Sequence, residues 1–159
     1  MQNQMNKYRR LKNLFLRQSY LDAWEDYQRS ILKKSFPKWD YIVLTASNEE
    51  QGKAFQKQIE YRSEKGVLPD ATKFLVIPDP DGKRIGSGGA TLHVLRTLSE
   101  REGFLGDFHG KRILVIHSGG DSKRVPQYSV CGKLFSPVPR ELPDGRGSTL
   151  FDEFLIGMS

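Results

Sequence analysis

The stretch Tyr41–Glu50 (YIVLTASNEE) combines a buried strand with the start of a helix. Its first six residues form a continuous, mostly apolar run, which is typical of strands buried on both faces of a sheet. Ser47 and Asn48 then offer helix N-caps, and Glu49 and Glu50 place negative charge where the helix dipole favours it. The stretch therefore predicts a strand that passes directly into a helix.

Two further apolar runs follow, at 74–77 and 113–116, and a glycine-containing loop comes after each of them. Apolar residues at helical spacing separate the three runs. These helical positions are Phe55, Ile59, Leu92, Leu95 and Leu98. Alternating strands and helices imply right-handed crossovers and a mainly parallel sheet, with ligands at the carboxyl ends of the strands. We expect 140–149 to form a polar turn or hairpin tip and 150–156 to begin a further helix.

The first 36 residues contain no glycine or proline and carry apolar side chains at helical spacing. These side chains are Tyr8, Leu11, Phe15, Tyr20, Trp24, Tyr27 and Ile31. We expect two amphipathic helices whose aromatic stripes pack on the core of the domain itself, rather than on a membrane or an acidic partner. Pro37 ends this region, so we divide the chain into an N-terminal helical segment, 1–36, and an α/β part, 37–159.

Length and composition limit the classes of protein that fit. A chain of 159 residues with 37% hydrophobic side chains suits one globular domain. The net charge of +6 favours anionic partners, of which phosphate is the common chemistry. Cys131 is the only cysteine, which excludes an internal disulfide and a cysteine-based metal site and fits a reducing cytoplasm. No apolar run reaches signal-peptide or membrane-spanning length, so we expect no export and no membrane partner.

The first glycine loop, DPDGKRIGSGGATL, contains four small residues just before a predicted helix. They are Gly86, Ser87, Gly88 and Gly89. Glycines at a helix start let backbone N–H groups approach a phosphate or a base. The loop fits neither the Walker template nor the dinucleotide fingerprint, because no Gly-Lys-Ser/Thr follows and Thr91 occupies the third small position. A nucleotide-lining loop and a plain tight turn therefore both remain open.

The second loop, HSGGDSKRVPQYSVCGK, leaves the third predicted strand and is richer in phosphate-binding chemistry. Gly119 and Gly120 would let the backbone wrap around a nucleotide. Ser122 can donate to a phosphate oxygen, and the planar guanidinium of Arg124 can bind two such oxygens at once. Lys133 adds a point charge. A solvated basic loop is the alternative interpretation. The other loop residues that we expect to line the nucleotide site are His117, Ser118, Asp121 and Lys123.

These motifs resemble a known family. Gly119-Gly120-x-Ser122-x-Arg124, with Lys133 downstream, resembles the signature loop of sugar nucleotidyltransferases. More narrowly, DPDGKRIGSGGATL followed by RILVIHSGGDSKRVPQYSVCGKLFSPVP is similar to the paired motifs of fucose-1-phosphate guanylyltransferases and bifunctional fucokinase/guanylyltransferases. The preceding segment, WDYIVLTASNEEQGKAFQKQIEYRSEKGVLP, is similar to the opening of the fucokinase family. The resemblance therefore spans about residues 39–139.

The resemblance implies a Rossmann-like, GT-A-type nucleotidyltransferase fold that is incomplete here and is preceded by the N-terminal helices. It also implies synthesis of GDP-fucose from GTP and fucose 1-phosphate, with release of pyrophosphate and with Mg²⁺ as cofactor. In this reaction Gly119 and Gly120 would seat the guanine nucleotide, Arg124 would hold the departing phosphates and Lys133 would neutralise charge near the α-phosphate. Arg124 and Lys133 are thus the catalytic candidates.

In such enzymes the metal-binding aspartate and the sugar-recognition half come well after the signature loop, so we expect this chain to lack both. An open sheet edge would then favour self-association or pairing with the missing half. The alternatives are the N-terminal domain of a fucokinase and a truncated, inactive nucleotide-binding module. Nucleic-acid binding through the basic surface is a third class, but the chain lacks the interleaved aromatic and basic motif expected for it.

Overall fold

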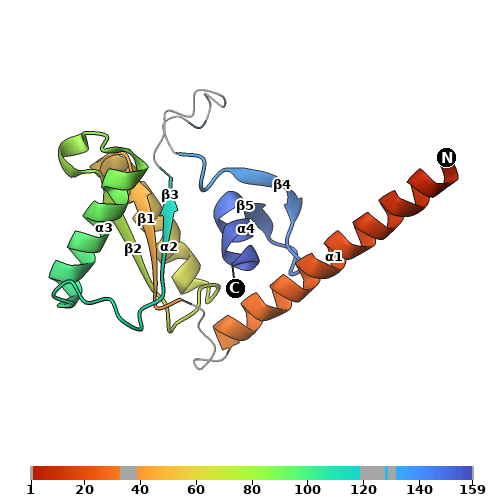
Figure 1. The fold of residues 1–159 in the computed structure, drawn as a ribbon, viewed down its shortest axis with the longest axis horizontal. Coiled ribbons are helices and arrows are strands. Elements are labelled where there is room, and N and C mark those ends of the chain that lie inside the picture. Colours follow the sequence, from red (N-terminus) through yellow and green to blue (C-terminus); the bar gives the residue numbers. More distant parts are fainter. Residues whose placement is uncertain (1, 33–38, 119–127, 129–131, 159) are drawn as a thin grey trace.

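The computed structural model describes residues 2–32, 39–118, 128 and 132–158. In these ranges the chain forms a small parallel sheet covered by helices, a C-terminal hairpin and helix, and a long N-terminal helix that reaches away from the rest (Figure 1). The elements are α1 (Gln2–Leu32), β1 (Tyr41–Ala46), α2 (Glu49–Glu64), β2 (Lys73–Pro78), η1 (Pro80–Gly82), α3 (Gly86–Glu102), β3 (Ile113–His117), β4 (Pro137–Glu141), β5 (Gly147–Thr149) and α4 (Leu150–Gly157).

The sheet has the order β2-β1-β3, and both strand pairs are parallel. All six residues of the central strand β1 are buried, as its apolar run predicts. The residues of β2 and β3 are mostly half-buried, because each of these strands has one neighbour in the described sheet. The predicted, mainly parallel and incomplete α/β sheet is confirmed.

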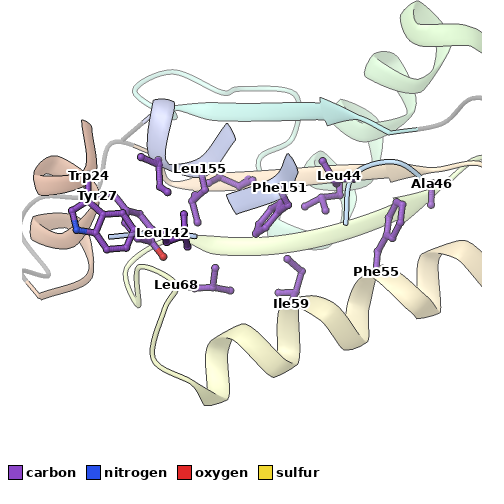
Figure 2. Close-up of a cluster of buried hydrophobic side chains, with 13 residues drawn as sticks. Trp24, Tyr27, Leu44, Ala46, Phe55, Ile59, Leu68, Leu142, Phe151 and Leu155 are labelled. Atoms are coloured by element: carbon purple, nitrogen blue, oxygen red, sulfur yellow. The ribbon is translucent and has the colours of Figure 1, made fainter. Parts of the chain in front are cut away.

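Alternate residues of β1 point into two cores on opposite faces of the sheet, as the two-residue period of a strand requires. Ile42 and Leu44 join the larger core, which α1, α2 and α4 cover (Figure 2). Val43 joins a smaller core under α3, with Val94 and Leu98.

The predicted helix after β1 is confirmed. The Asn48 side chain accepts a hydrogen bond from the Gln51 backbone N–H at 2.8 Å, which is the expected N-cap of α2. Phe55 and Ile59 are buried on its inner face, also as expected.

The helix predicted from the pattern through Leu92, Leu95 and Leu98 is confirmed as α3, but the pattern does not mark its buried face. Leu92 is 70% exposed, and Ala90, Val94 and Leu98 form the buried stripe instead. The helix meets the sheet along an i, i+4 row, and Leu92 lies on the far side of that row.

The N-terminal region differs from its prediction in two ways. It is one helix, α1, and not two. Trp24 and Tyr27 are buried as expected, but Tyr8 and Phe15 are 73% and 71% exposed. Tyr8 and Phe15 lie in the N-terminal half of α1, which extends away from the other described elements (Figure 1). The described part of the chain has no helix long and apolar enough to cross a membrane.

The C-terminal part forms the predicted hairpin and helix. β4 and β5 are antiparallel, and Thr149 and Asp152 form a capping box at the start of α4. Asp152 also receives hydrogen bonds from the buried Arg62 of α2, at 2.9 and 3.1 Å. This ion pair fastens the C-terminal part to the sheet unit.

Candidate functional site

A small pocket opens where the three parallel strands end and α3 begins. Its volume is about 140 Å³. We call it the strand-end pocket, and it is lined by Thr45, Ser47, Asp79, Arg84, Gly86, Ser87, Ala90 and His117. Each strand contributes a residue at or just after its carboxyl end, which is where ligands bind in open α/β sheets. The sequence predicts a ligand site at this edge.

The first glycine loop enters the pocket through the start of α3. Gly86 has a φ of +71°, which glycine adopts without strain. Gly86 and Ser87 line the pocket, whereas Gly88 and Gly89 continue the first turn of α3 without lining it. Packing accounts for the glycine at position 89, because a Cβ at Gly89 would lie 2.9 Å from the Cβ of Ile85. The N–H groups of a first helical turn lack intrahelical acceptors, so this end of α3 offers donors to a ligand.

His117, the last residue of β3, joins the second glycine loop to α3. Its Nε2 lies 3.1 Å from the Thr91 hydroxyl, which itself donates to the carbonyl of Ser87 at 2.9 Å. Because the Thr91 hydroxyl already donates to Ser87, it accepts from His117, which favours the tautomer with hydrogen on Nε2. The end of the first predicted loop, in the first turns of α3, therefore meets the start of the second loop.

Ser118 ties the start of the second loop to the central strand. Its backbone N–H donates to the Thr45 hydroxyl at 3.3 Å, and its side chain donates to the Thr45 carbonyl. The remaining predicted residues of this loop, Gly119, Gly120, Asp121, Ser122, Lys123 and Arg124, lie outside the described residues, as does Cys131.

Lys133 lines a neighbouring, larger cavity of about 490 Å³ along the edge of β3. We call this cavity the β3-edge cleft. His117 lines both cavities, and Ser118 joins Lys133 in the cleft. The other lining residues are Leu114, Val115, Ile116, Leu134, Leu150, Phe154 and Met158. Gly132 holds the backbone beside Lys133 against α2, because its φ is +73° and a Cβ there would lie 2.9 Å from Phe55.

Sequence reasoning missed four polar residues of the strand-end pocket: Thr45, Ser47, Asp79 and Arg84. Asp79 and Arg84 stand inside the quoted DPDGKRIGSGG motif, and Thr45 and Ser47 flank the end of the first predicted strand. Their position next to strand ends was the available indication.

A metal site built from protein side chains alone does not occur in the described ranges, where no three His, Cys, Asp or Glu residues gather. Mg²⁺ in nucleotide sites is bound through one or two carboxylates together with substrate phosphates. Among the described residues that line the strand-end pocket, Asp79 is the carboxylate that could join substrate phosphates around such an ion.

Comparison with known proteins adds to this geometry. Residues 106–159 match the fucose pyrophosphorylase domain family. The chain is 41% identical over 140 residues to the bifunctional fucokinase/GDP-fucose pyrophosphorylase of Arabidopsis thaliana. This match covers 75% of this chain and 13% of that protein. It is 40% identical over 102 residues to the fucose-1-phosphate guanylyltransferase of Mus musculus, covering 64% of this chain and 17% of that protein. The chain thus spans less than a fifth of these relatives. No solved structure matches.

Proposed function

We propose that this chain, a relative of the fucose-1-phosphate guanylyltransferases, forms the nucleotide-binding part of an enzyme that makes GDP-fucose from GTP and fucose 1-phosphate. One structural observation supports the proposal above the others. The two glycine motifs that resemble this family follow β2 and β3, the strands on either side of β1, and His117 and Thr91 join them at 3.1 Å. One nucleotide can therefore contact both motifs.

The proposed reaction needs no nucleophile from the protein. A phosphate oxygen of fucose 1-phosphate attacks the α-phosphorus of GTP. The bond from that phosphorus to the bridging oxygen of the β-phosphate breaks, and pyrophosphate leaves with the electron pair. Alignment and charge neutralisation accelerate such a transfer. Mg²⁺, when bound, would neutralise phosphate charge.

The residues of this chain would supply the rest of the alignment. Lys133 lines the β3-edge cleft beside Ser118, where it would neutralise charge near the α-phosphate. Arg124, outside the described residues, would hold the β- and γ-phosphates that depart. We propose that this chain acts in the reducing cytoplasm, because a chain with a single cysteine fits that compartment.

The direct test is to incubate the chain, and any longer product of the same gene, with GTP, Mg²⁺ and fucose 1-phosphate and to measure pyrophosphate. Arg124→Ala and Lys133→Ala should cut pyrophosphate release by orders of magnitude. Lys57→Ala, on the exposed side of α2, is the matched control and should change nothing.

The binding arm of the test uses this chain alone. A rise in melting temperature that depends on both GTP and Mg²⁺ would support the nucleotide site even where pyrophosphate is absent, because the reaction would then need the further length present in the relatives. Indifference to GTP, together with nucleic-acid binding that weakens steeply with salt, would contradict the proposal.

A further inference from the structure

The N-terminal half of α1, residues 5–21, is an exposed helical segment with one apolar face. We infer that this segment lies on the surface of a membrane that contains anionic lipids, with its apolar face among the headgroups and its cations beside the lipid phosphates. Such a helix lies along the bilayer, which differs from the membrane-crossing helix that the described part of the chain lacks. The inference goes beyond the proposed function, because none of these residues lines the strand-end pocket or the β3-edge cleft.

The rest of the described chain does not cover this segment. Every side chain from residue 5 to residue 19 is exposed, and the helix leads away from the other elements (Figure 1). The large apolar side chains among those exposed in the segment are Met5, Tyr8, Leu11, Leu14, Phe15, Leu16 and Leu21. The packing on the domain's own core that the sequence predicts therefore does not occur here. Exposed apolar patches of this kind mark surfaces that bind a protein or a membrane.

Most of these side chains share one face of the helix. At 3.6 residues per turn, five of them fall within an arc of about 140°, namely Tyr8, Leu11, Leu14, Phe15 and Leu21. Lys7 and Gln18 also lie in this arc, and a lysine there can bury its stem while its ammonium stays at headgroup level. The arc points away from the side of α1 that carries Trp24 and Tyr27, which join the larger core. A flat surface can therefore approach the arc from the side opposite the body of the protein.

Cations border the apolar arc. Residues 2–21 contain no Asp or Glu and five basic residues, which are Lys7, Arg9, Arg10, Lys12 and Arg17. By the same helical geometry, Arg10 lies just beyond one border of the arc and Lys12 beyond the other. In a helix that lies on a bilayer, basic side chains in these positions reach the lipid phosphates while their stems cover apolar surface. Each such residue strengthens attraction to an anionic membrane about 5-fold.

The charge pattern favours lipid over a second copy of the chain. Two of these segments in contact would bring the five cations of one copy against the five of the other. An anionic lipid surface instead supplies negative charge along the whole segment, and the cytoplasmic leaflet of membranes contains such lipids. The arc becomes acidic at Asp22, Glu25 and Asp26, so the lipid contact ends there.

The experiment measures co-sedimentation of the whole chain with vesicles of phosphatidylcholine alone and with vesicles of equal parts phosphatidylcholine and phosphatidylserine. We expect binding to the anionic vesicles to be at least about 10-fold tighter, because several cations contribute. Binding should weaken at least about 10-fold when the ionic strength rises from about 0.1 M to 1 M, where the screening length falls from about 10 Å to about 3 Å.

Leu11 and Leu16 provide a matched pair of variants. Their exposed fractions are nearly equal, 55% and 53%, but Leu16 lies about 140° around the helix from Leu11 and outside the apolar arc. Leu11→Ser should weaken binding to anionic vesicles about 10-fold, whereas Leu16→Ser should keep the wild-type affinity. Lys12→Gln should weaken it about 5-fold, and Lys57→Gln, on the exposed side of α2, should not. The melting temperature of each variant verifies that it is folded.

The contrary outcomes are distinct from those of the GTP experiments. Equal binding to the two kinds of vesicle, or equal losses for Leu11→Ser and Leu16→Ser, overturns the inference. Absence of vesicle binding also overturns it. If the chain then forms a dimer that Leu11→Ser weakens, measured by light scattering at several concentrations, a second copy is the occupant of this face. None of these results changes the expectation for nucleotide binding.

Discussion

Replacing Asp152 with asparagine tests whether the C-terminal hairpin and α4 are fastened to the sheet by a buried ion pair. The Asp152 carboxylate receives hydrogen bonds from Arg62 at 2.9 and 3.1 Å, and both side chains are less than 10% exposed. The Arg62 guanidinium also lies over the rings of Phe135 and Phe151, at 4.9 and 5.4 Å from their centroids. The change to asparagine keeps the shape of the residue and removes its charge.

We expect a loss of about 3 kcal/mol in the free energy of unfolding at pH 7. Two hydrogen bonds to a charged group contribute about 1.5–3 kcal/mol each, and removing one partner of a buried pair costs about 3–5 kcal/mol. The expected loss lies at the low end of the 3–5 kcal/mol range because one hydrogen bond survives. The Thr149 backbone N–H donates to the Asp152 carboxylate at 2.9 Å, and it can still donate to the side-chain oxygen of asparagine. For a chain of this size, a loss of about 3 kcal/mol lowers the melting temperature by about 6–12 °C.

The assay is urea unfolding followed by circular dichroism, with Glu100→Gln as the matched control. Glu100 pairs with Arg96 at 2.8 Å on the surface of α3, where the two side chains are 63% and 79% exposed, so removing its charge should leave the midpoint unchanged within error. A loss below about 1 kcal/mol for Asp152→Asn would refute the reasoning, because the pair would then be no stronger than an ordinary exposed one.

The pH dependence supplies a second readout of the same ion pair. Burial raises the pKa of Asp152, but the hydrogen bonds from Arg62 and Thr149 lower it by more, so the net pKa lies below the usual value. Because the pKa is lower in the folded state, ionised Asp152 makes its full contribution to the free energy of unfolding above the unfolded-state pKa of about 3.9. This contribution is lost as the pH falls through the folded-state pKa. The difference between wild type and Asp152→Asn should therefore be constant from pH 7 to about 5 and shrink below about pH 4.

Three further predictions concern the site and its glycines. In urea unfolding, Gly66→Ala should lower the free energy of unfolding by about 1–2 kcal/mol, because Gly66 has a positive φ. Gly132→Ala should lower it by more. Gly132 also has a positive φ, and an added Cβ there would come within 3.0 Å of a side chain, which does not happen at Gly66. Gly88→Ala should raise stability by up to about 1 kcal/mol, because an alanine in that helical turn meets no described atom within 4 Å, whereas Gly89→Ala should lower the melting temperature. Lys133→Met should weaken GTP binding in calorimetry and reduce its salt dependence, and an unchanged affinity would contradict its placement near the phosphates.

Local patterns in the sequence predicted most of the sheet unit. The strand β1, the Asn48 cap and the inner face of α2 depend on neighbours within a few residues, so periodicity and capping preference suffice to find them. The same reasoning failed for the first half of α1. A helical stripe of apolar residues shows which side is apolar, but not whether another element covers that side, and Tyr8 and Phe15 remain exposed.

For the site, the sequence by itself determined that two glycine loops follow strands and therefore lie at the same edge of a parallel sheet. Only the tertiary structure decided which side chains share a cavity. The order β2-β1-β3 places Asp79 and His117 on either side of the β1 end, although they are far apart in the chain. Lys133 lines the neighbouring cleft instead, because Gly132 packs its backbone on α2. Such groupings depend on long-range packing, which a local pattern of residues does not encode.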